Sequence, residues 1–198
     1  MKFLTTEKGT YRYINRQRII EIFKTIILFS FAIGLYLIGY LTLKTNKSLW
    51  TIFAVLSVLP AAKSAVIMIM FLRFSSISND DYSAIEESRG SVPLKYEYAF
   101  TTREKSYFVK SAACYDNTVI VLMDDKYNKG KNKNLAANEL KEHLKMSIER
   151  EGLKDYSLKI YTDLKGYCKR LDEMNANLNP QEDSSSAYVF ALFNAISI

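Results

Sequence analysis

Two long apolar runs dominate the first third of the chain. Residues 25–43 contain no charged side chain, and at a rise of about 1.5 Å per residue a helix of this length spans about 28 Å, close to the hydrocarbon thickness of a bilayer. The second run, residues 49–74, is interrupted in its interior only by Pro60 and Lys63. The pattern predicts a transmembrane helical hairpin over residues 19–74, with helices at about 19–43 and 49–74.

The rest of the chain has the mixed pattern of a folded domain. Residues 75–92 favour a juxtamembrane helix and linker, with Asn79 as its cap and Gly90 at its end. Residues 93–198 predict a small α/β domain. In its first strand an alternating set of apolar residues is expected to share one buried face: Leu94, Tyr96, Tyr98 and Phe100.

Turn and stripe signals complete the predicted fold. Asp116-Asn117 between two apolar strands is typical of a two-residue hairpin turn. An apolar stripe at Leu140, Leu144 and Ile148 predicts an amphipathic helix, and another strand and helix follow. The expected class is therefore an α+β membrane protein: a transmembrane hairpin, then helix, three antiparallel strands, helix, strand and helix, forming a mixed sheet. The apolar tail predicts one more helix packed on the domain.

Charge predicts the orientation. The residues before the first apolar run include five basic side chains, at Lys2, Lys8, Arg12, Arg16 and Arg18. The loop between the two runs has only Lys44 and Lys47. The positive-inside rule then places both termini in the cytoplasm, with residues 1–18 as a basic cytoplasmic arm of a multi-pass protein of the cell (plasma) membrane. Two widely separated cysteines agree with a reducing compartment.

The basic arm suggests a lipid partner. A lysine or arginine beside an anionic inner leaflet gains about 1 kcal/mol, so four residues are predicted to contact lipid headgroups: Lys8, Arg12, Arg16 and Arg18. The net charge of +6 is mild and does not favour nucleic acid as a partner.

Lys63 is the unusual residue of the second run. A charge at mid-span costs about 2.5–3.5 kcal/mol on insertion scales. We predict an intramembrane polar site made by Lys63, Pro60, which frees a backbone carbonyl, and Ser30 of the first helix. Two interpretations remain open: Lys63 faces the seam between the two helices, or it faces a polar cavity formed by several copies of the chain.

Small residues recur every four positions in both runs. Ser57, Ala61 and Ala65 form one such set, and Ser30 and Gly34 form the other. This spacing predicts close helix packing, either within one chain or in a homo-oligomer joined through the transmembrane helices.

Signals for catalysis are few. The single histidine, His143, lacks a metal-binding partner at the usual spacing, the cysteines lack metal spacing, and no phosphate loop is present, so neither a metal nor a cofactor is predicted. One enzyme hypothesis remains, a metal-dependent nuclease of the restriction-endonuclease-like kind. If residues 107 and 126 pair across the hairpin, Glu104 approaches Asp124, with Lys126 as the third catalytic candidate.

Two strings carry a resemblance. "LPAAKSAV" at residues 59–66 and "KIYTDLKGYCKRL" at residues 159–171 resemble small two-pass membrane proteins of Gram-positive bacteria with a cytoplasmic α/β domain. The resemblance implies the same architecture and brings no catalytic residues.

The sequence therefore favours a membrane-anchored cytoplasmic domain that binds a partner protein or ligand whose identity the sequence does not give, rather than an enzyme. The alternatives are an oligomeric transport or channel component that uses Lys63, and the nuclease.

Overall fold

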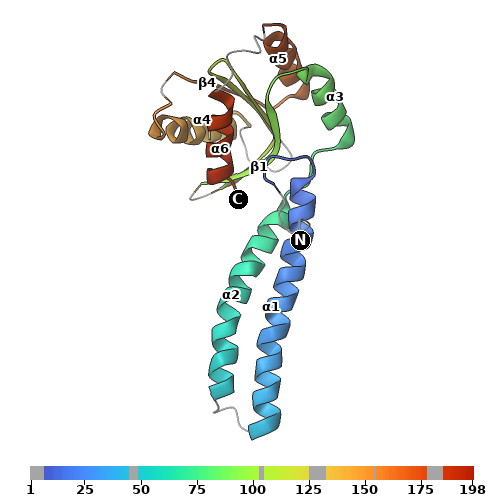
Figure 1. The fold of residues 1–198 in the computed structure, drawn as a ribbon, viewed down its shortest axis with the longest axis vertical. Coiled ribbons are helices and arrows are strands. Elements are labelled where there is room, and N and C mark those ends of the chain that lie inside the picture. The colour runs from blue at the N-terminus through green and yellow to red at the C-terminus, as the bar shows by residue number, and fades with distance from the viewer. Residues whose placement is uncertain (1–6, 45–48, 103–104, 125–132, 154, 178–184) are drawn as a thin grey trace. The chain divides into compact units, whose positions relative to one another are not determined.

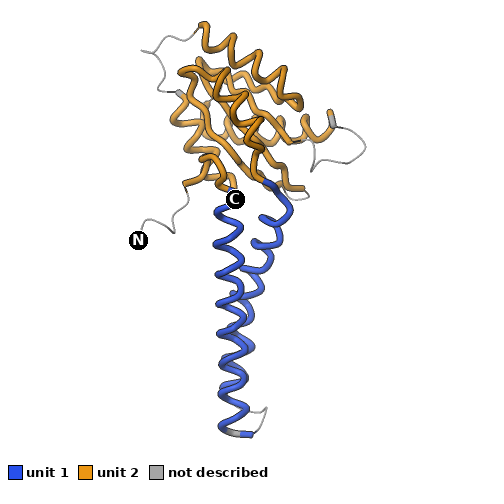
Figure 2. Tube along the Cα trace, turned by 90° about the vertical axis from the view of Figure 1, so that its right-hand side faces the viewer, with its two compact units in different colours: residues 1–6, 14–75 blue, residues 7–13, 76–198 orange. Residues whose placement is uncertain are grey.

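The structure is a computed structural model of the chain, and it describes residues 7–44, 49–102, 105–124, 133–153, 155–177 and 185–198. These divide into two compact units (Figure 2). Residues 14–75 form the helical hairpin, and residues 7–13 together with 76–198 form the α/β unit. Residues 7–13 of the predicted basic arm thus fold with the α/β unit rather than apart from it.

The helical hairpin consists of α1 (Tyr13–Leu43) and α2 (Leu49–Arg73). The helix α1 begins ahead of the predicted start at residue 19, because the polar residues before the apolar run continue the same helix. Both helices are long and apolar enough to cross a membrane: the most apolar 18-residue stretch has a mean hydropathy of 2.0 in α1 and 2.1 in α2.

The seam between the two helices has a heptad period. Its buried positions in α1 are Glu21, Thr25, Ala32 and Gly39, and those in α2 are Ala54, Ala61, Ser64 and Phe71. Steps of three, four and seven residues are typical of left-handed coiled-coil packing. Within one chain the predicted four-residue stripes do not form the seam: Ala61 is fully buried, whereas Ser57 and Ala65 are only half-buried and Ser30 is exposed.

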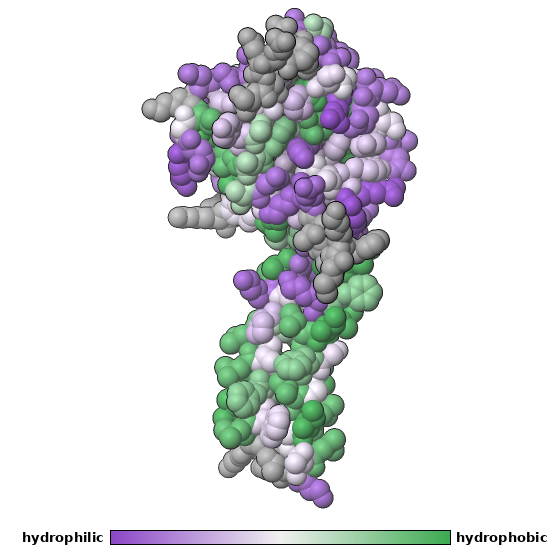
Figure 3. Space-filling view, viewed as in Figure 1, coloured by the Kyte–Doolittle hydropathy of each residue, from purple (hydrophilic) through white to green (hydrophobic). Residues whose placement is uncertain are grey.

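Large apolar side chains cover the outside of the hairpin. Examples are Ile27, Leu41, Leu49, Leu59 and Val66, all more than 60% exposed. Figure 3 shows this surface as a largely continuous hydrophobic one, while polar residues cover much of the surface of the α/β unit.

The α/β unit contains a four-stranded sheet between two layers of helices (Figure 1). Its elements in chain order are α3 (Asn79–Arg89), β1 (Leu94–Thr101), β2 (Ser106–Tyr115), β3 (Thr118–Met123), α4 (Lys133–Arg150), β4 (Ser157–Tyr161), α5 (Leu164–Ala176) and α6 (Ser185–Ile196). The strand order is β1-β2-β3-β4, with the first three antiparallel and β4 parallel to β3. The predicted fold class, with its mixed sheet, is confirmed.

Each face of the sheet has its own core. The helices α4 and α6 cover one face, where Leu140, Leu144 and Ile148 pack as predicted. The helices α3 and α5 cover the other face, through Ile85 and Tyr167 among others. The C-terminal helix packs on the domain, as the apolar tail predicts.

The prediction that the apolar residues of β1 share one face is wrong. Leu94 and Tyr96 belong to the core under α3 and α5, whereas Tyr98 and Phe100 belong to the core under α4 and α6. Between the two pairs lies Glu97, whose φ of +54° breaks the alternation. A matching irregularity in β2 lies between Val109 and Ser111. An extra residue in a strand reverses the face of every side chain after it.

The outer edge of β1 is covered by the two ends of the chain. The N–H of Tyr96 donates to the carbonyl of Gly9 at 2.9 Å, and the N–H of Ile198 donates to that of Ala99 at 3.0 Å. Gly9 has a φ of +79°, and a Cβ there would lie 2.9 Å from the hydroxyl of Tyr98. Glycine is therefore required for the N-terminal segment to lie this close to the strand.

Candidate functional site

Within the α/β unit, the segments that precede and follow the helical hairpin in the chain both bind one buried carboxylate. The chain enters the helical hairpin after Tyr13 and leaves it at Ser75. The residues of the α/β unit next to both points are tied to Glu97, which is fully buried. Its Oε1 atom accepts hydrogen bonds from the backbone N–H of Arg12 at 3.2 Å, from the N–H of Ile77 at 3.0 Å, and from the hydroxyl of Ser76.

The backbone of Glu97 explains how one side chain reaches both segments. A non-glycine residue in the left-handed region costs about 1–2 kcal/mol and is found where surrounding contacts enforce it. Here the bulge turns the carboxylate out of the regular alternation of β1 and toward the backbone donors. Glu97 thus joins the two segments to the edge of the sheet, and we call it the junction carboxylate.

Two of the predicted lipid-contacting residues, Lys8 and Arg12, form hydrogen bonds within the α/β unit. The ammonium of Lys8 donates to the carbonyls of Asn194 at 3.1 Å and Ser197 at 2.5 Å, at the C-terminal end of α6. Such a position is favourable for a cation. Burial lowers the pKa of the Lys8 ammonium below its usual value. The guanidinium of Arg12 is exposed and donates to Asn79 at 3.1 Å.

The other two predicted lipid-contacting residues lie in the helical hairpin. Arg18 donates to the carbonyls of Phe71, at 3.3 Å, and Phe74. Because the last carbonyls of a helix lack partners within it, Arg18 caps the end of α2. Arg16 is exposed. Lys8, Arg12 and Arg18 therefore have structural partners within their own unit, which the prediction from the basic arm did not include.

The three residues of the predicted intramembrane site do not meet in the seam. Lys63, Pro60 and Ser30 are all exposed on the single chain. The seam polar pair is instead Thr25 and Ser64, whose hydroxyls are 2.9 Å apart. At 100° per residue, burying Ser64 turns Lys63 away from the partner helix. Among the residues that the structure describes, no hydrogen bond or ion pair joins Lys63 to another side chain.

The seam also begins with a buried acid, Glu21, that the sequence analysis did not predict there. Glu21 is 5% exposed, accepts from the side-chain amide of Gln17 at 3.2 Å, and lies 3.2 Å from the ammonium of Lys24. The heptad spacing from Glu21 to Thr25 and Ala32 could have located it in the seam.

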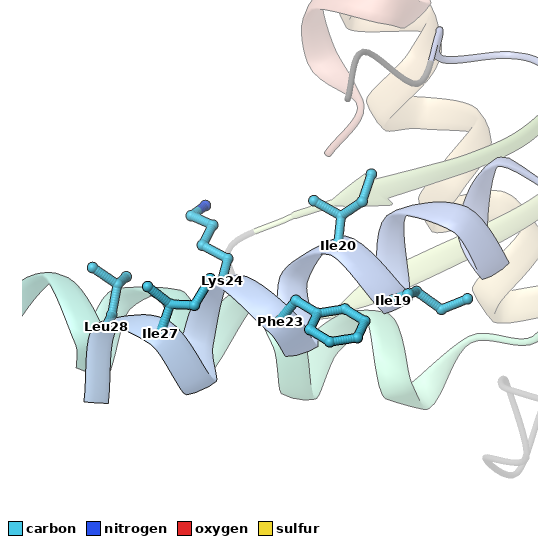
Figure 4. A pocket seen from close by; sticks show the side chains of 6 residues that line it. All are labelled: Ile19, Ile20, Phe23, Lys24, Ile27 and Leu28. Atoms are coloured by element: carbon cyan, nitrogen blue, oxygen red, sulfur yellow. The ribbon is translucent and has the colours of Figure 1, made fainter. Parts of the chain in front are cut away.

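The outer face of α1 carries a shallow apolar groove (Figure 4). Its volume is about 500 Å³, and its lining residues are Ile19, Ile20, Phe23, Lys24, Ile27 and Leu28. The ammonium of Lys24 is the only polar side-chain group among them (Figure 4). An apolar groove with one cation at its rim matches a lipid with an acyl chain and an anionic headgroup.

The predicted nuclease site is described only at Asp124. This residue is 5% exposed, and its Oδ1 lies 3.9 Å from the ammonium of Lys110, which also binds Asp81 at 2.8 Å. Glu104 and Lys126 lie outside the described residues. No group of three side chains suited to a metal ion occurs in the described part of the chain.

The strand register around Asp124 differs from the one on which the nuclease hypothesis depends. A hairpin that pairs residue 107 with residue 126 would place Val109 opposite Asp124. The irregularity beside Lys110 shifts this pairing by one residue, so that Val109 lies opposite Met123. The side chain that reaches Asp124 is then Lys110 of the bulge.

A second groove lies between α4 and the paired ends of β1 and β2. It has a volume of about 710 Å³, and its floor includes Tyr107, which donates from its hydroxyl to Glu139 at 2.5 Å. Lys105 binds the same carboxylate at 2.9 Å. The hydrogen bond from Tyr107 and then that from Lys105 hold the pKa of Glu139 below its usual value. His143 also lines this groove and is half-buried.

No family model, curated protein or solved structure matches this chain.

Proposed function

We propose that this chain is an integral membrane protein whose helical hairpin anchors the α/β unit at the cytoplasmic face of the plasma membrane, and that the α/β unit is a binding domain. The observation that carries the proposal is the surface of the hairpin: large apolar side chains outside, small and polar ones in the seam. In water each large apolar side chain left exposed forgoes about 1.5–3 kcal/mol of burial. In lipid the same surface contacts hydrocarbon and incurs no such cost, while the small residues of the seam allow the two helices to pack closely.

The charges at the ends of the hairpin support the orientation. Arg16 is exposed and Lys24 keeps half of its side-chain surface exposed, at the end of α1 that carries the basic arm. Both are suited to an anionic inner leaflet, and the groove beside Lys24 is suited to an acyl chain. The resemblance to two-pass membrane proteins of Gram-positive bacteria supports the same arrangement and a bacterial origin.

A binding role is favoured over catalysis by the state of the charged clusters. Lys110 is bound by Asp81 and approaches Asp124, and Lys105 is bound by Glu139. Carboxylates that are already paired with cations stabilise the fold, and they are poor candidates for a general base.

The exposure of Lys63 supports a second candidate function. A cation on the apolar surface of a membrane helix costs about 2.5–3.5 kcal/mol, and contact with a polar cavity between several copies would remove that cost. The second candidate is therefore an oligomeric transport or channel component.

Washing and proteolysis of membranes test the first proposal. The full chain should stay in the membrane fraction after an alkaline wash, and its α/β unit should be digested only in inside-out vesicles. Release by the wash, or digestion in right-side-out vesicles, would overturn the proposal. A Lys63→Leu variant separates the candidates: it should insert normally and keep the size of the parent in detergent if the hairpin is an anchor, whereas an oligomer that depends on Lys63 should change size.

A further inference from the structure

The two edges of the sheet differ in how they are covered. Gly9 and Ile198 bond to the outer edge of β1, so a partner strand has no access there. The opposite edge is β4, which pairs with β3 through five residue pairs from Thr118–Ser157 to Leu122–Tyr161. Within the ranges that the structure describes, no strand pairs with the outer side of β4. An open edge strand is a template for one more strand.

The backbone groups that face outward from β4 follow from one hydrogen bond. The N–H of Ser157 donates to the carbonyl of Asn117 at 2.8 Å, toward β3. Because backbone groups alternate in direction along a strand, those of Lys159 also face β3, whereas those of Leu158 and Ile160 face outward. Each of these two residues presents one donor and one acceptor to a partner strand.

A basic hollow lies beside this edge. It has a volume of about 240 Å³ and is lined by Ala137, Asn138, Lys141, Lys159, Ile160 and Tyr161. Lys141 comes from α4 and Lys159 from β4, and both residues are exposed. Because Leu158 and Ile160 pack on the α4 side of the sheet, the side chain of Lys159 points to the other side, so the two lysines flank the edge from its two faces. Neither forms an ion pair with an acid that the structure describes. The hydrogen bond from Arg170, at 2.7 Å, is the main cause that lowers the pKa of the Glu173 carboxylate, and Lys159 adds only a minor Coulombic contribution.

We propose that the outer edge of β4 is a docking site for an extended acidic segment of another protein, which adds a fifth strand to the sheet. The docking site specifies the partner in the proposed binding function. It depends on that proposal in one respect, that the α/β unit is the part that binds. Main-chain bonds to Leu158 and Ile160 supply affinity, and the two lysines select an acidic sequence.

Charge disfavours a second copy of the chain as the occupant. Antiparallel pairing of two β4 strands about their central residue sets Lys159 of one copy opposite Lys159 of the other. Like charges directly opposite each other destabilise a strand pair. An acidic segment replaces this repulsion with attraction.

A designed peptide tests the docking site. The probe is a blocked peptide of about seven residues that alternates valine and aspartate, long enough to span the roughly 17 Å of β4. It is added to the full chain in phosphatidylcholine nanodiscs, and hydrogen exchange is measured at single amides. The acidic peptide should protect the amides of Leu158 and Ile160. The same peptide with N-methylated amides on its pairing edge should not.

Charge reversal provides the matched controls. The double variant Lys141→Glu with Lys159→Glu should weaken binding of the acidic peptide by at least about tenfold and let the lysine version of the peptide bind. The double variant Lys165→Glu with Lys169→Glu changes net charge equally on exposed residues of α5 and should bind the acidic peptide as the parent does.

Three results would overturn the docking site: no protection of β4 amides at millimolar peptide, equal weakening by both double variants, or protection that appears without peptide and rises with protein concentration. The last would indicate self-pairing. If any of these occurs while the chain stays in alkali-washed membranes, the docking site fails and the proposed anchor stands. Loss from the washed membranes would refute the proposed function instead.

Discussion

Replacing Glu97 by alanine removes the acceptor that holds the segments before and after the helical hairpin. The N–H of Ile77 lies on a buried residue, so the loss of its partner costs about 1–3 kcal/mol. Arg12 is exposed and Ser76 is half-exposed, so water can replace much of what they lose, leaving up to about 1 kcal/mol. We expect Glu97→Ala to destabilise the junction by about 1–4 kcal/mol.

The assay is hydrogen exchange of the full chain in phosphatidylcholine nanodiscs. A loss of about 1–4 kcal/mol corresponds to exchange roughly 5- to 700-fold faster at the amide of Ile77. Glu97→Gln keeps an acceptor oxygen and should lose less. Glu87→Ala changes an exposed glutamate of α3 and should stay within about 0.5 kcal/mol of the parent.

Glycine at the same position provides the sharpest check. In an ordinary strand, glycine is less stable than alanine by about 0.5–1 kcal/mol. Glu97 has a φ of +54°, so the order should be reversed and Glu97→Gly should be milder than Glu97→Ala by about 1 kcal/mol. The reasoning is refuted if exchange near Ile77 is unchanged in Glu97→Ala, or if the glycine variant is the less stable one.

Three further predictions follow from the packing. Ala61→Leu should overfill the seam and destabilise the helical hairpin in detergent by about 1–3 kcal/mol. The exposed Ala62→Leu should have little effect on the thermal midpoint, and equal effects of the two variants would contradict the heptad seam. Gly9→Ala should cost more than Gly152→Ala in thermal unfolding, because both have positive φ but only Gly9 would clash, and the reverse order would contradict the packing on β1. Burial raises the pKa of Tyr98, so the contribution of its neutral hydroxyl to stability is complete below about pH 10 and is lost as the pH rises further. Ultraviolet titration should detect the Tyr98 tyrosinate only together with unfolding. Reversible ionisation of Tyr98 in the folded chain would contradict this prediction.

Local signals in the sequence predicted the parts of the fold that local contacts determine. The Asp116-Asn117 turn is an example: both residues have positive φ, +45° and +54°, as a two-residue hairpin turn requires. The stripe of Leu140, Leu144 and Ile148 likewise identified the buried face of α4.

The junction depends on partners distant in sequence, and for that reason no local pattern predicted it. The alternation in β1 made Glu97 appear to be a solvent-facing residue. Its burial depends on Arg12, 85 residues away, and on Ile77, 20 residues away, and neither separation leaves a mark in a local pattern. The shift of register beside Lys110 is also a tertiary effect, and it displaced the partner expected for Asp124.

Cysteine labelling on intact cells tests the membrane anchoring and its direction most directly. Cys168 is partly exposed and is first changed to serine, whereas Cys114 is buried and is kept. A single new cysteine then replaces either Lys44, at the end of α1, or Glu149, on the exposed side of α4. With an impermeant thiol reagent, Lys44→Cys should react on intact cells and Glu149→Cys only after the membrane is permeabilised. Reaction of Glu149→Cys on intact cells would contradict a cytoplasmic α/β unit held by a two-helix anchor.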